Sequence, residues 1–123
     1  MAKTILVVED NPKDLVLARD LLNLSGYKAI EATDGEQGVK LARKYKPDLI
    51  LMDVMMPKMD GYTACRAIKM DKATREIPVV MLTALDYDLN KALAGDVGAN
   101  GYLTKPISRQ KLLDIIQRFS PTS

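Results

Sequence analysis

The sequence lacks the side chains on which several common kinds of active site depend. It contains no histidine and only one cysteine, Cys65, among its 123 residues. The absence of histidine excludes a Ser-His-Asp or Cys-His catalytic site, a histidine-containing zinc site and a phosphohistidine carried by this chain. One cysteine cannot form an internal disulfide or supply the ligands of a zinc or iron–sulfur cluster. Any chemistry must therefore come from carboxylates, lysine, hydroxyls, backbone groups or a hard cation.

Long apolar runs and glycine-rich phosphate-binding loops are also missing. The longest apolar stretches are a handful of residues, too short to cross a bilayer, and no signal peptide pattern opens the chain. No G-x-x-x-x-G-K-[ST] or G-x-G-x-x-G motif comes after an expected strand, so NTPases and dinucleotide enzymes fit badly. Together with the single cysteine, which suggests a reducing compartment, these absences predict a cytoplasmic protein without membrane contact.

The overall composition is that of an ordinary soluble domain. Apolar residues make up 47% and charged residues 28% of the chain. A length of 123 residues fits one domain, which we place at 1–120, with a tail at 121–123. The net charge of +2 is too mild to argue for nucleic-acid binding, and we expect none.

Short apolar segments alternate with longer amphipathic ones along the whole chain. The expected strands are 4–8, 28–32, 48–52, 78–82 and 101–104, and the expected helices are 12–25, 35–45, 61–70, 87–94 and 109–119. Five strands alternating with five helices predict an α/β fold with a doubly wound parallel sheet. The strands at 4–8, 48–52 and 78–82 are almost continuously apolar, as in strands buried on both faces. Glu31 interrupts strand 28–32, which favours an edge position.

Two local features carry further structural expectations. The helix 12–25 has a broad apolar arc, which consists of Leu15, Leu17, Ala18, Leu21, Leu22 and Leu24. Gly61, at the start of helix 61–70, is expected to supply a permissive backbone.

Polar side chains gather where the expected strands end. Glu9 and Asp10 come after the first strand, Asp53 after the third, Thr83 after the fourth and Lys105 after the fifth. In a doubly wound sheet, sites lie outside the carboxyl ends of the strands. If the first and third strands are neighbours, about 4.8 Å apart, the acids share one pocket. Crowded carboxylates repel one another unless a cation joins them, and an all-oxygen ligand set suits Mg²⁺. This pattern favours phosphoryl transfer onto Asp53 as the nucleophile.

Each of these side chains also has a purely structural interpretation. An acidic loop before Pro12 could serve only to cap a helix, and Asn11 is best explained in that way. Lys105 could be a solvated surface lysine, and Thr83 could cap the next segment. Tyr102 is consistent with a strand aromatic that is half-packed against the fourth helix. The case for a site rests on the group, because its members fall at one edge of one sheet.

Five segments in the same order and spacing resemble the receiver domains of two-component response regulators. They are ILVVEDN (5–11), PDLILMDVMMP (47–57), MDG (59–61), PVVMLTA (78–84) and GYLTKP (101–106). The resemblance extends from Ile5 to Phe119, and the chain is similar to the single-domain chemotaxis regulator and to cell-cycle regulator receiver modules. It implies a flavodoxin-like fold with strand order 2-1-3-4-5.

The resemblance also implies the chemistry of the site. Asp53 would accept a phosphoryl group from the phosphohistidine of a sensor histidine kinase or a histidine phosphotransfer protein. The ligands of Mg²⁺ would be Glu9, Asp10, Asp53 and the backbone carbonyl of Met55. The domain would promote its own phosphotransfer and dephosphorylation without being a free-standing enzyme.

Three further residues would carry the signal. Lys105, whose peptide bond to Pro106 is cis in this family, would pair with a phosphoryl oxygen as a point charge. Thr83 would turn its hydroxyl toward the same group, and Tyr102 would then rotate inward. This switch would reshape the surface formed by helix 87–94, strand 101–104 and helix 109–119 for a downstream protein. Its candidate contacts are Leu89, Lys91, Arg109 and Gln110.

Other functions remain open at this point. The chain could be a phosphorylation-independent interaction module with the same fold, or the receiver part of a longer regulator with an effector domain. A Mg²⁺-dependent phosphohydrolase fits less well, because Met55 stands where such an enzyme usually has a second acid. Met55 and Leu85, two residues after Asp53 and Thr83, are both apolar. Since positions of this kind tune phosphoryl lifetime in the family, we expect slow self-dephosphorylation.

Overall fold

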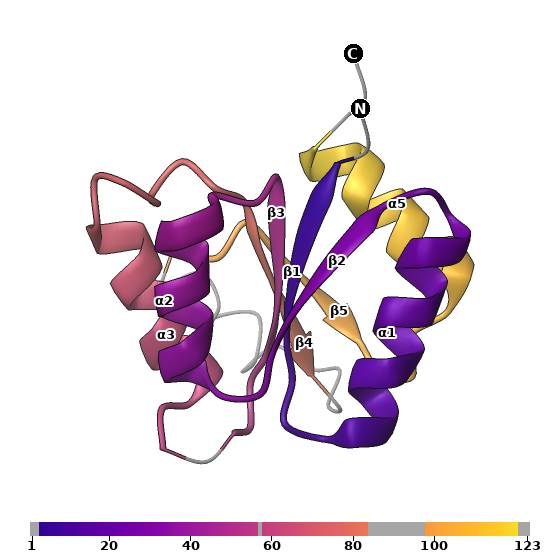
Figure 1. Ribbon diagram of the computed structural model, residues 1–123, viewed down its shortest axis with the longest axis horizontal. Coiled ribbons are helices and arrows are strands. Elements are labelled where there is room, and N and C mark those ends of the chain that lie inside the picture. The colour runs from indigo at the N-terminus through magenta and orange to yellow at the C-terminus, as the bar shows by residue number, and fades with distance from the viewer. Residues whose placement is uncertain (1–2, 57, 84–97, 121–123) are drawn as a thin grey trace.

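The computed structural model describes residues 3–56, 58–83 and 98–120 and contains five strands and four helices within them (Figure 1). In chain order they are β1 (Thr4–Val8), α1 (Pro12–Leu24), β2 (Lys28–Ala32), α2 (Gly35–Tyr45), β3 (Leu49–Asp53), α3 (Gly61–Met70), β4 (Val79–Thr83), β5 (Gly101–Thr104) and α5 (Arg109–Phe119). The expected helix at 87–94 and the expected tail at 121–123 lie outside the described residues.

The five strands form one parallel sheet in the order β2-β1-β3-β4-β5, which confirms the predicted doubly wound topology. β1 lies between β2 and β3, with Ile5 opposite Leu49 and Val8 opposite Met52. β2 is an edge strand, as predicted from Glu31. The side chain of Glu31 is exposed at this edge, and its carboxylate lies 3.7 Å from the guanidinium of Arg19 on α1.

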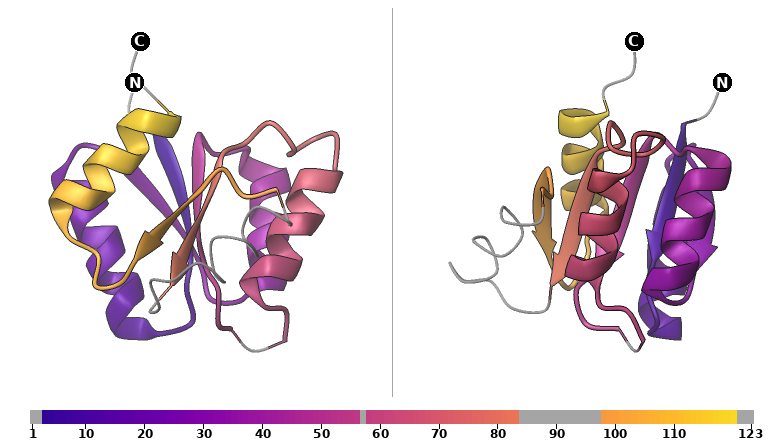
Figure 2. Two further views of the ribbon diagram at one scale, coloured as in Figure 1. Left: turned by 180° about the vertical axis from the view of Figure 1, so that it is seen from behind. Right: turned by 90° about the vertical axis from the view of Figure 1, so that its left-hand side faces the viewer.

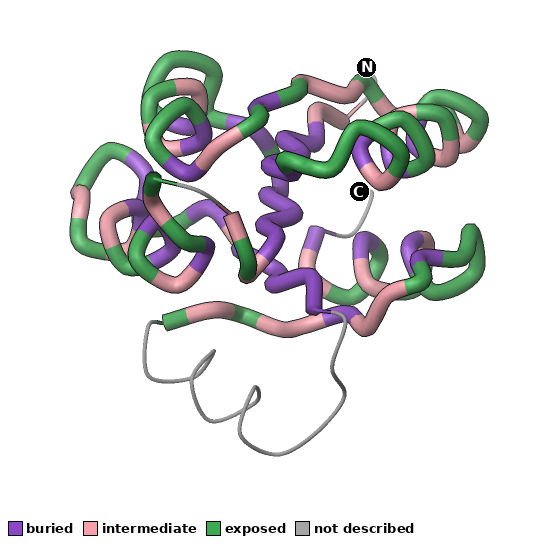
Figure 3. The backbone as a smooth tube through the Cα atoms, turned by 90° about the horizontal axis from the view of Figure 1, so that it is seen from below, coloured by how far each residue is buried: buried purple, intermediate pink, exposed green. Residues whose placement is uncertain are grey.

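Helices cover both faces of the sheet (Figures 1 and 2). Alternate residues of β1, β3 and β4 point to opposite faces, so the sheet contributes to two separate cores. One core joins the strands to α1 and α5 and includes Ile5, Leu51, Leu82, Leu22 and Ile116. The other joins them to α2 and α3 and includes Leu6, Met52, Met81, Ala42 and Ile68. Burial on both faces explains why these three strands have no polar alternation; Figure 3 shows the buried strands between the helices.

Side-chain caps fix the first turns of the helices next to the sheet edge. The Asn11 side chain accepts hydrogen bonds from the backbone N–H groups of Lys13 and Asp14, at 2.9 and 3.3 Å, so it caps α1 as expected. Ser108 caps α5 by accepting from the Lys111 N–H at 3.2 Å. These caps hold the chain that leaves β1 and β5 close to the carboxyl edge of the sheet.

β3 and β4 each begin and end one residue later than the sequence predicts. The ladder continues through Asp53, which lies opposite Leu82, and through Thr83, which lies opposite Thr104. The Lys105 N–H also donates to the Thr83 carbonyl at 2.7 Å. Asp53 and Thr83 are therefore the last residues of buried strands, and not the first residues of loops, so the sheet itself positions them.

Packing corrects two local expectations. The apolar arc of α1 is narrower than predicted, because Leu17 is 40% and Leu24 is 76% exposed, whereas Leu15, Ala18 and Leu22 are buried. Gly61 is needed for space and not for an unusual backbone conformation, since the glycines with positive φ among the described residues are Gly26 and Gly98. A Cβ atom on Gly61 would overlap the backbone carbonyl oxygen of Asp53, so only glycine lets α3 begin directly against the end of β3.

No helix among the described residues combines the length and the apolar character needed to cross a membrane.

Candidate functional site

A cavity of about 390 Å³ opens at the carboxyl ends of β1, β3 and β4. All but one of the predicted site residues line it: Glu9, Asp10, Asp53, Met55, Thr83 and Lys105. The exception is Tyr102, which lines a separate hollow with Leu103, Thr104, Lys111 and Arg118. The tertiary structure therefore brings together residues separated by up to 96 positions in the chain.

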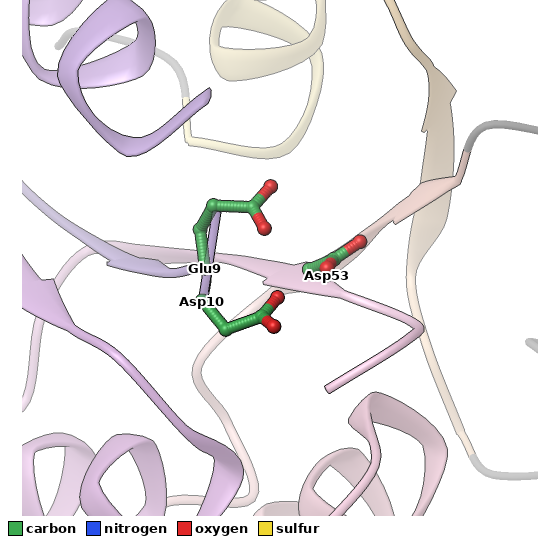
Figure 4. A group of neighbouring side chains, drawn as sticks. All are labelled: Glu9, Asp10 and Asp53. Carbon is green, nitrogen blue, oxygen red and sulfur yellow. The ribbon is translucent and has the colours of Figure 1, made fainter. Parts of the chain in front are cut away.

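Three carboxylates form the acidic part of this cavity. One oxygen from each of Glu9, Asp10 and Asp53 lies within 4.8 Å of the others, and Figure 4 shows Glu9 and Asp10 extending from the end of β1 toward Asp53. Glu9 is 1% and Asp53 is 6% exposed, whereas Asp10 faces solvent. The pairing of β1 with β3 thus produces the predicted cluster, with two buried acids and one acid open to water.

The ammonium of Lys105 lies inside the site and not in solvent. Its Nζ donates to Glu9 Oε1 at 2.5 Å and to Asp14 Oδ2 at 3.1 Å, and it lies 3.3 Å from Asp53 Oδ1. The Lys105 side chain is only 16% exposed, which excludes the interpretation as a solvated surface lysine. The Lys105–Pro106 peptide bond is cis, as the resemblance implies.

Asp14 is a member of this group that the sequence patterns did not indicate. It lies in the first turn of α1, where its backbone N–H donates a hydrogen bond to the side chain of Asn11. The available signal was an acidic residue one helical turn after the acid pair. In the sequence, however, a first-turn acid is explained equally well by the dipole of its own helix. Only the approach of Lys105 from β5 shows that Asp14 faces the site.

The site contains more negative than positive charge. Four carboxylates, those of Glu9, Asp10, Asp14 and Asp53, line the cavity with one ammonium. Burial raises the pKa of Glu9 to about 7; the hydrogen bond from Lys105 opposes this shift and the nearby Asp53 carboxylate adds to it. Burial by itself would lower the pKa of Lys105, but its contacts with Glu9, Asp14 and Asp53 outweigh burial and raise it. Lys105 is therefore a permanent cation in a pocket whose carboxylates outnumber its one ammonium group.

The donor set fits a hard divalent cation. Carboxylate oxygens within 4.8 Å of one another, one of them on solvent-facing Asp10, match the oxygen ligands and retained waters that Mg²⁺ prefers. A divalent cation would also offset the excess negative charge of the cavity. The side chain of Met55 is 80% exposed at the rim of the cavity.

Thr83 and Tyr102 lie on neighbouring strands at different depths. Thr83 is 4% exposed at the end of β4, in the cavity that contains Asp53 and Lys105. Tyr102, on β5, is partly buried against the core on the α2 and α3 face. The sequence suggests a contact of Tyr102 with the helix at 87–94, and that helix lies outside the described residues.

The fold and the cavity define a flavodoxin-like α/β domain with an acidic pocket at the carboxyl edge of its sheet. The sequence signature of the response regulator receiver domain matches residues 5–117. The chain belongs to this family of two-component signalling domains.

The chain is similar to regulators of two different lengths. It is 42% identical over 109 residues to the transcriptional regulator RpaA of Synechocystis and 43% identical over 112 residues to the transcriptional regulatory protein PhoP of Bacillus subtilis. It spans less than half of each, 45% and 46% respectively. It is 38% identical to PilH of Pseudomonas aeruginosa and 35% identical to the polar-differentiation response regulator DivK of Brucella anthropi, and it spans 93% and 97% of them.

Solved receiver structures share the whole fold. The Vibrio cholerae chemotaxis protein CheY4 superimposes with a TM-score of 0.92 at 31% identity, covering 97% of this chain and 99% of that one. The receiver domain of the Pseudomonas aeruginosa sensor histidine kinase PA1611, with magnesium coordinated in its active site cleft, gives 0.92 at 35% identity, covering 99% and 100%.

The raised pKa of Glu9 predicts an unusual pH dependence of stability in metal-free buffer. Folded Glu9 keeps its proton up to about pH 7, whereas its ordinary pKa is 4.5, so the folded state binds more protons between these values. The free energy of unfolding of the wild type should therefore fall, relative to that of Glu9→Gln, as the pH rises from 4.5 to 7. Urea unfolding at several pH values measures this difference. Glu31→Gln, at the sheet edge, should keep the wild-type profile; parallel curves for wild type and Glu9→Gln would contradict the assignment.

Proposed function

We propose that this chain is a phosphorylation-dependent signalling switch that accepts a phosphoryl group on Asp53. The observation that carries the proposal is the environment of Asp53. Asp53 is 6% exposed, and its carboxylate lies 3.3 Å from the Lys105 ammonium and clusters with Glu9 and Asp10. A buried carboxylate with a fixed cation beside it is suited to nucleophilic attack on phosphorus, because positive charge is already in place for the phosphoryl oxygens.

The donor in this proposal is a phosphohistidine on a sensor histidine kinase or a histidine phosphotransfer protein. A carboxylate oxygen of Asp53 forms a bond to phosphorus as the phosphorus–nitrogen bond breaks, and the electron pair of that bond stays on the imidazole nitrogen. Lys105 holds one phosphoryl oxygen as a point charge. Mg²⁺, held by Glu9, Asp10, Asp53 and the backbone carbonyl of Met55, would supply the remaining positive charge for the transferring group.

Two observations support the cofactor and the compartment. The related receiver domain of PA1611 has magnesium coordinated in its active site cleft, and this chain has three acids whose oxygens lie close enough together to hold a cation. Cys65 is buried and forms no disulfide, which fits a reducing compartment such as the cytoplasm. The proposed role is that of a receiver that promotes its own phosphotransfer and dephosphorylation, and not of a free-standing enzyme.

The switch would run from Thr83 to Tyr102. Once Asp53 carries a phosphoryl group, the Thr83 hydroxyl moves toward its oxygens and Tyr102 rotates into the space released. The surface near β5 and α5 changes as a result. Arg109 and Gln110, two of the predicted contacts, are exposed at the start of α5, and Leu89 and Lys91 lie outside the described residues.

The output of the switch would be contact with a downstream protein. This chain matches PilH and DivK over nearly their whole length, so these two proteins support the proposal that the output is a protein contact. RpaA and PhoP, which it matches over less than half, support the alternative of a receiver within a longer transcriptional regulator.

Phosphorylation should require both Asp53 and a divalent cation. Incubation with acetyl phosphate and Mg²⁺ should add one phosphoryl group, seen by intact-protein mass spectrometry, and Asp53→Asn or chelation with EDTA should abolish it. Asp60→Asn is the control, because Asp60 caps α3 close by without joining the acid cluster. No adduct on folded wild-type protein, with the small donor or with a histidine kinase, would favour the phosphorylation-independent module instead.

Coupling between the two switch residues can be measured without a known partner. Addition of Mg²⁺ and beryllium fluoride, which mimics the phosphoryl group on aspartate, should shift the NMR signals of the Tyr102 ring. Thr83→Ala should bind the mimic but leave the Tyr102 signals near their free positions, because the hydroxyl that responds to the phosphoryl group is gone. Thr104→Ala, which changes the residue opposite Thr83 in the sheet, should keep the shift. A full Tyr102 response in Thr83→Ala would disprove the coupling.

The phosphorylated protein should lose its phosphoryl group slowly. Met55, at the rim of the cavity, has no group that can position a water molecule for attack on phosphorus, and the same holds for Leu85, which lies outside the described residues. Loss of the mass adduct over time measures the rate, and Met55→Asn should accelerate it. Met70→Asn replaces another exposed methionine, on α3 and 73% exposed, and should leave the rate unchanged. Turnover of the wild type within seconds would contradict this expectation.

A further inference from the structure

The ammonium of Lys105 has three hydrogens and faces three carboxylates. Glu9 and Asp14 accept hydrogen bonds at 2.5 and 3.1 Å, and Asp53 lies 3.3 Å away. An ammonium group can donate three hydrogen bonds at most. Without a phosphoryl group, Lys105 therefore donates hydrogen bonds to Glu9 and Asp14 and forms an ion pair with Asp53.

A phosphoryl group on Asp53 would bring new oxygens to the same ammonium, and these oxygens would compete with the carboxylates that Lys105 already contacts. The three carboxylates differ in what release would cost. The side chain of Glu9 is 1% exposed and that of Asp53 is 8% exposed, whereas that of Asp14 is 36% exposed. Water can replace Lys105 at a carboxylate that is already partly hydrated, but it cannot do so readily at a buried one. Asp14 is therefore the partner that Lys105 can exchange most easily.

We propose that Asp14 is a positioning residue that holds Lys105 in the unphosphorylated protein and competes with the phosphoryl group for it. The proposal rests on the phosphoacceptor function proposed for Asp53. The Asp14 carboxylate would oppose phosphorylation in two ways: it occupies one hydrogen of the ammonium, and its charge repels an incoming anion at the same cavity. Asp14 would thus set the balance between the unphosphorylated and phosphorylated states.

The proposal predicts opposite effects of one substitution on two ligands. Asp14→Asn keeps the size of the side chain and removes its charge. The freed ammonium should bind an anion at Asp53 more tightly, whereas Mg²⁺ should bind more weakly because the cavity has lost one negative charge. If Asp14 served only to stabilise α1, its loss would weaken both ligands together or leave both unchanged.

The helix dipole needs its own control, since an acid in the first turn stabilises a helix whatever it faces. Glu36 occupies the first turn of α2 and is exposed, and it does not line the acidic cavity. Glu36→Gln removes a first-turn charge without touching Lys105. Asp14→Glu is the conservative variant that keeps a carboxylate on α1.

Isothermal titration calorimetry on the full chain tests the proposal. Mg²⁺ is titrated first, and beryllium fluoride is then titrated at saturating Mg²⁺. For Asp14→Asn we expect beryllium fluoride to bind about threefold more tightly and Mg²⁺ about threefold more weakly, the range of a partly exposed ion pair. Asp14→Glu and Glu36→Gln should stay close to the wild type for both ligands.

The outcomes separate this proposal from the one on which it rests. If the wild type is phosphorylated by acetyl phosphate on Asp53 but Asp14→Asn weakens both ligands or changes neither, the role of Asp14 is overturned and the receiver function stands. If the wild type binds neither beryllium fluoride nor a phosphoryl group, both proposals fall. A gain in anion affinity that Glu36→Gln shares would also overturn the role of Asp14, because it would then come from helix charge.

Discussion

The contact between the Lys105 ammonium and the carboxylates of Glu9, Asp14 and Asp53 is the interaction on which the rest of the site depends. Two of these acids are almost fully buried, and burying a carboxylate without a partner is costly. Lys105 makes their burial tolerable, yet one ammonium cannot balance the four acids of the cavity. Burial is the main reason why the pKa of Glu9 is raised, and the nearby Asp53 carboxylate adds to it. The remaining negative charge explains why a divalent cation suits the site.

The doubly wound topology brings this contact about. Since β1 and β3 are neighbours, Glu9 and Asp10 meet Asp53 across one strand spacing. β4 lies between β3 and β5, so Lys105 reaches the acids past the end of β4, where Thr83 lines the same cavity. The buried strands give Asp53 and Thr83 positions set by the sheet ladder. Gly61 contributes by its lack of a side chain, which lets α3 begin against the carbonyl of Asp53. The buried strands and the helix start therefore fix the positions of the polar side chains at this edge of the sheet.

The similar proteins differ in how much of their own length this chain spans. RpaA and PhoP are transcriptional regulators about twice the length of the matched segment, whereas PilH and DivK are matched over nearly all of their length. The family signature covers residues 5–117, a range that includes every residue of the acidic pocket. Asp14 has two roles that the other acids of the pocket do not combine. It lies in the first turn of α1, where a negative charge stabilises the helix, and it also accepts a hydrogen bond from Lys105.

The fold class, the described helices and strands, and the acid cluster could all be predicted from local sequence patterns. Its apolar runs predict buried parallel strands, its caps predict the helix starts, and Glu9, Asp10, Asp53, Thr83 and Lys105 are recognisable because each stands at a strand end. Periodicity and strand-end position are local properties, so they can be read from one chain. Four features could not be predicted in this way: the burial of Lys105, its contact with Asp14, the space required at Gly61, and the exposure of Leu17 and Leu24. Those features depend on which segments approach one another across the sheet, and no local pattern specifies the distance between a first-turn aspartate and a lysine 91 positions away.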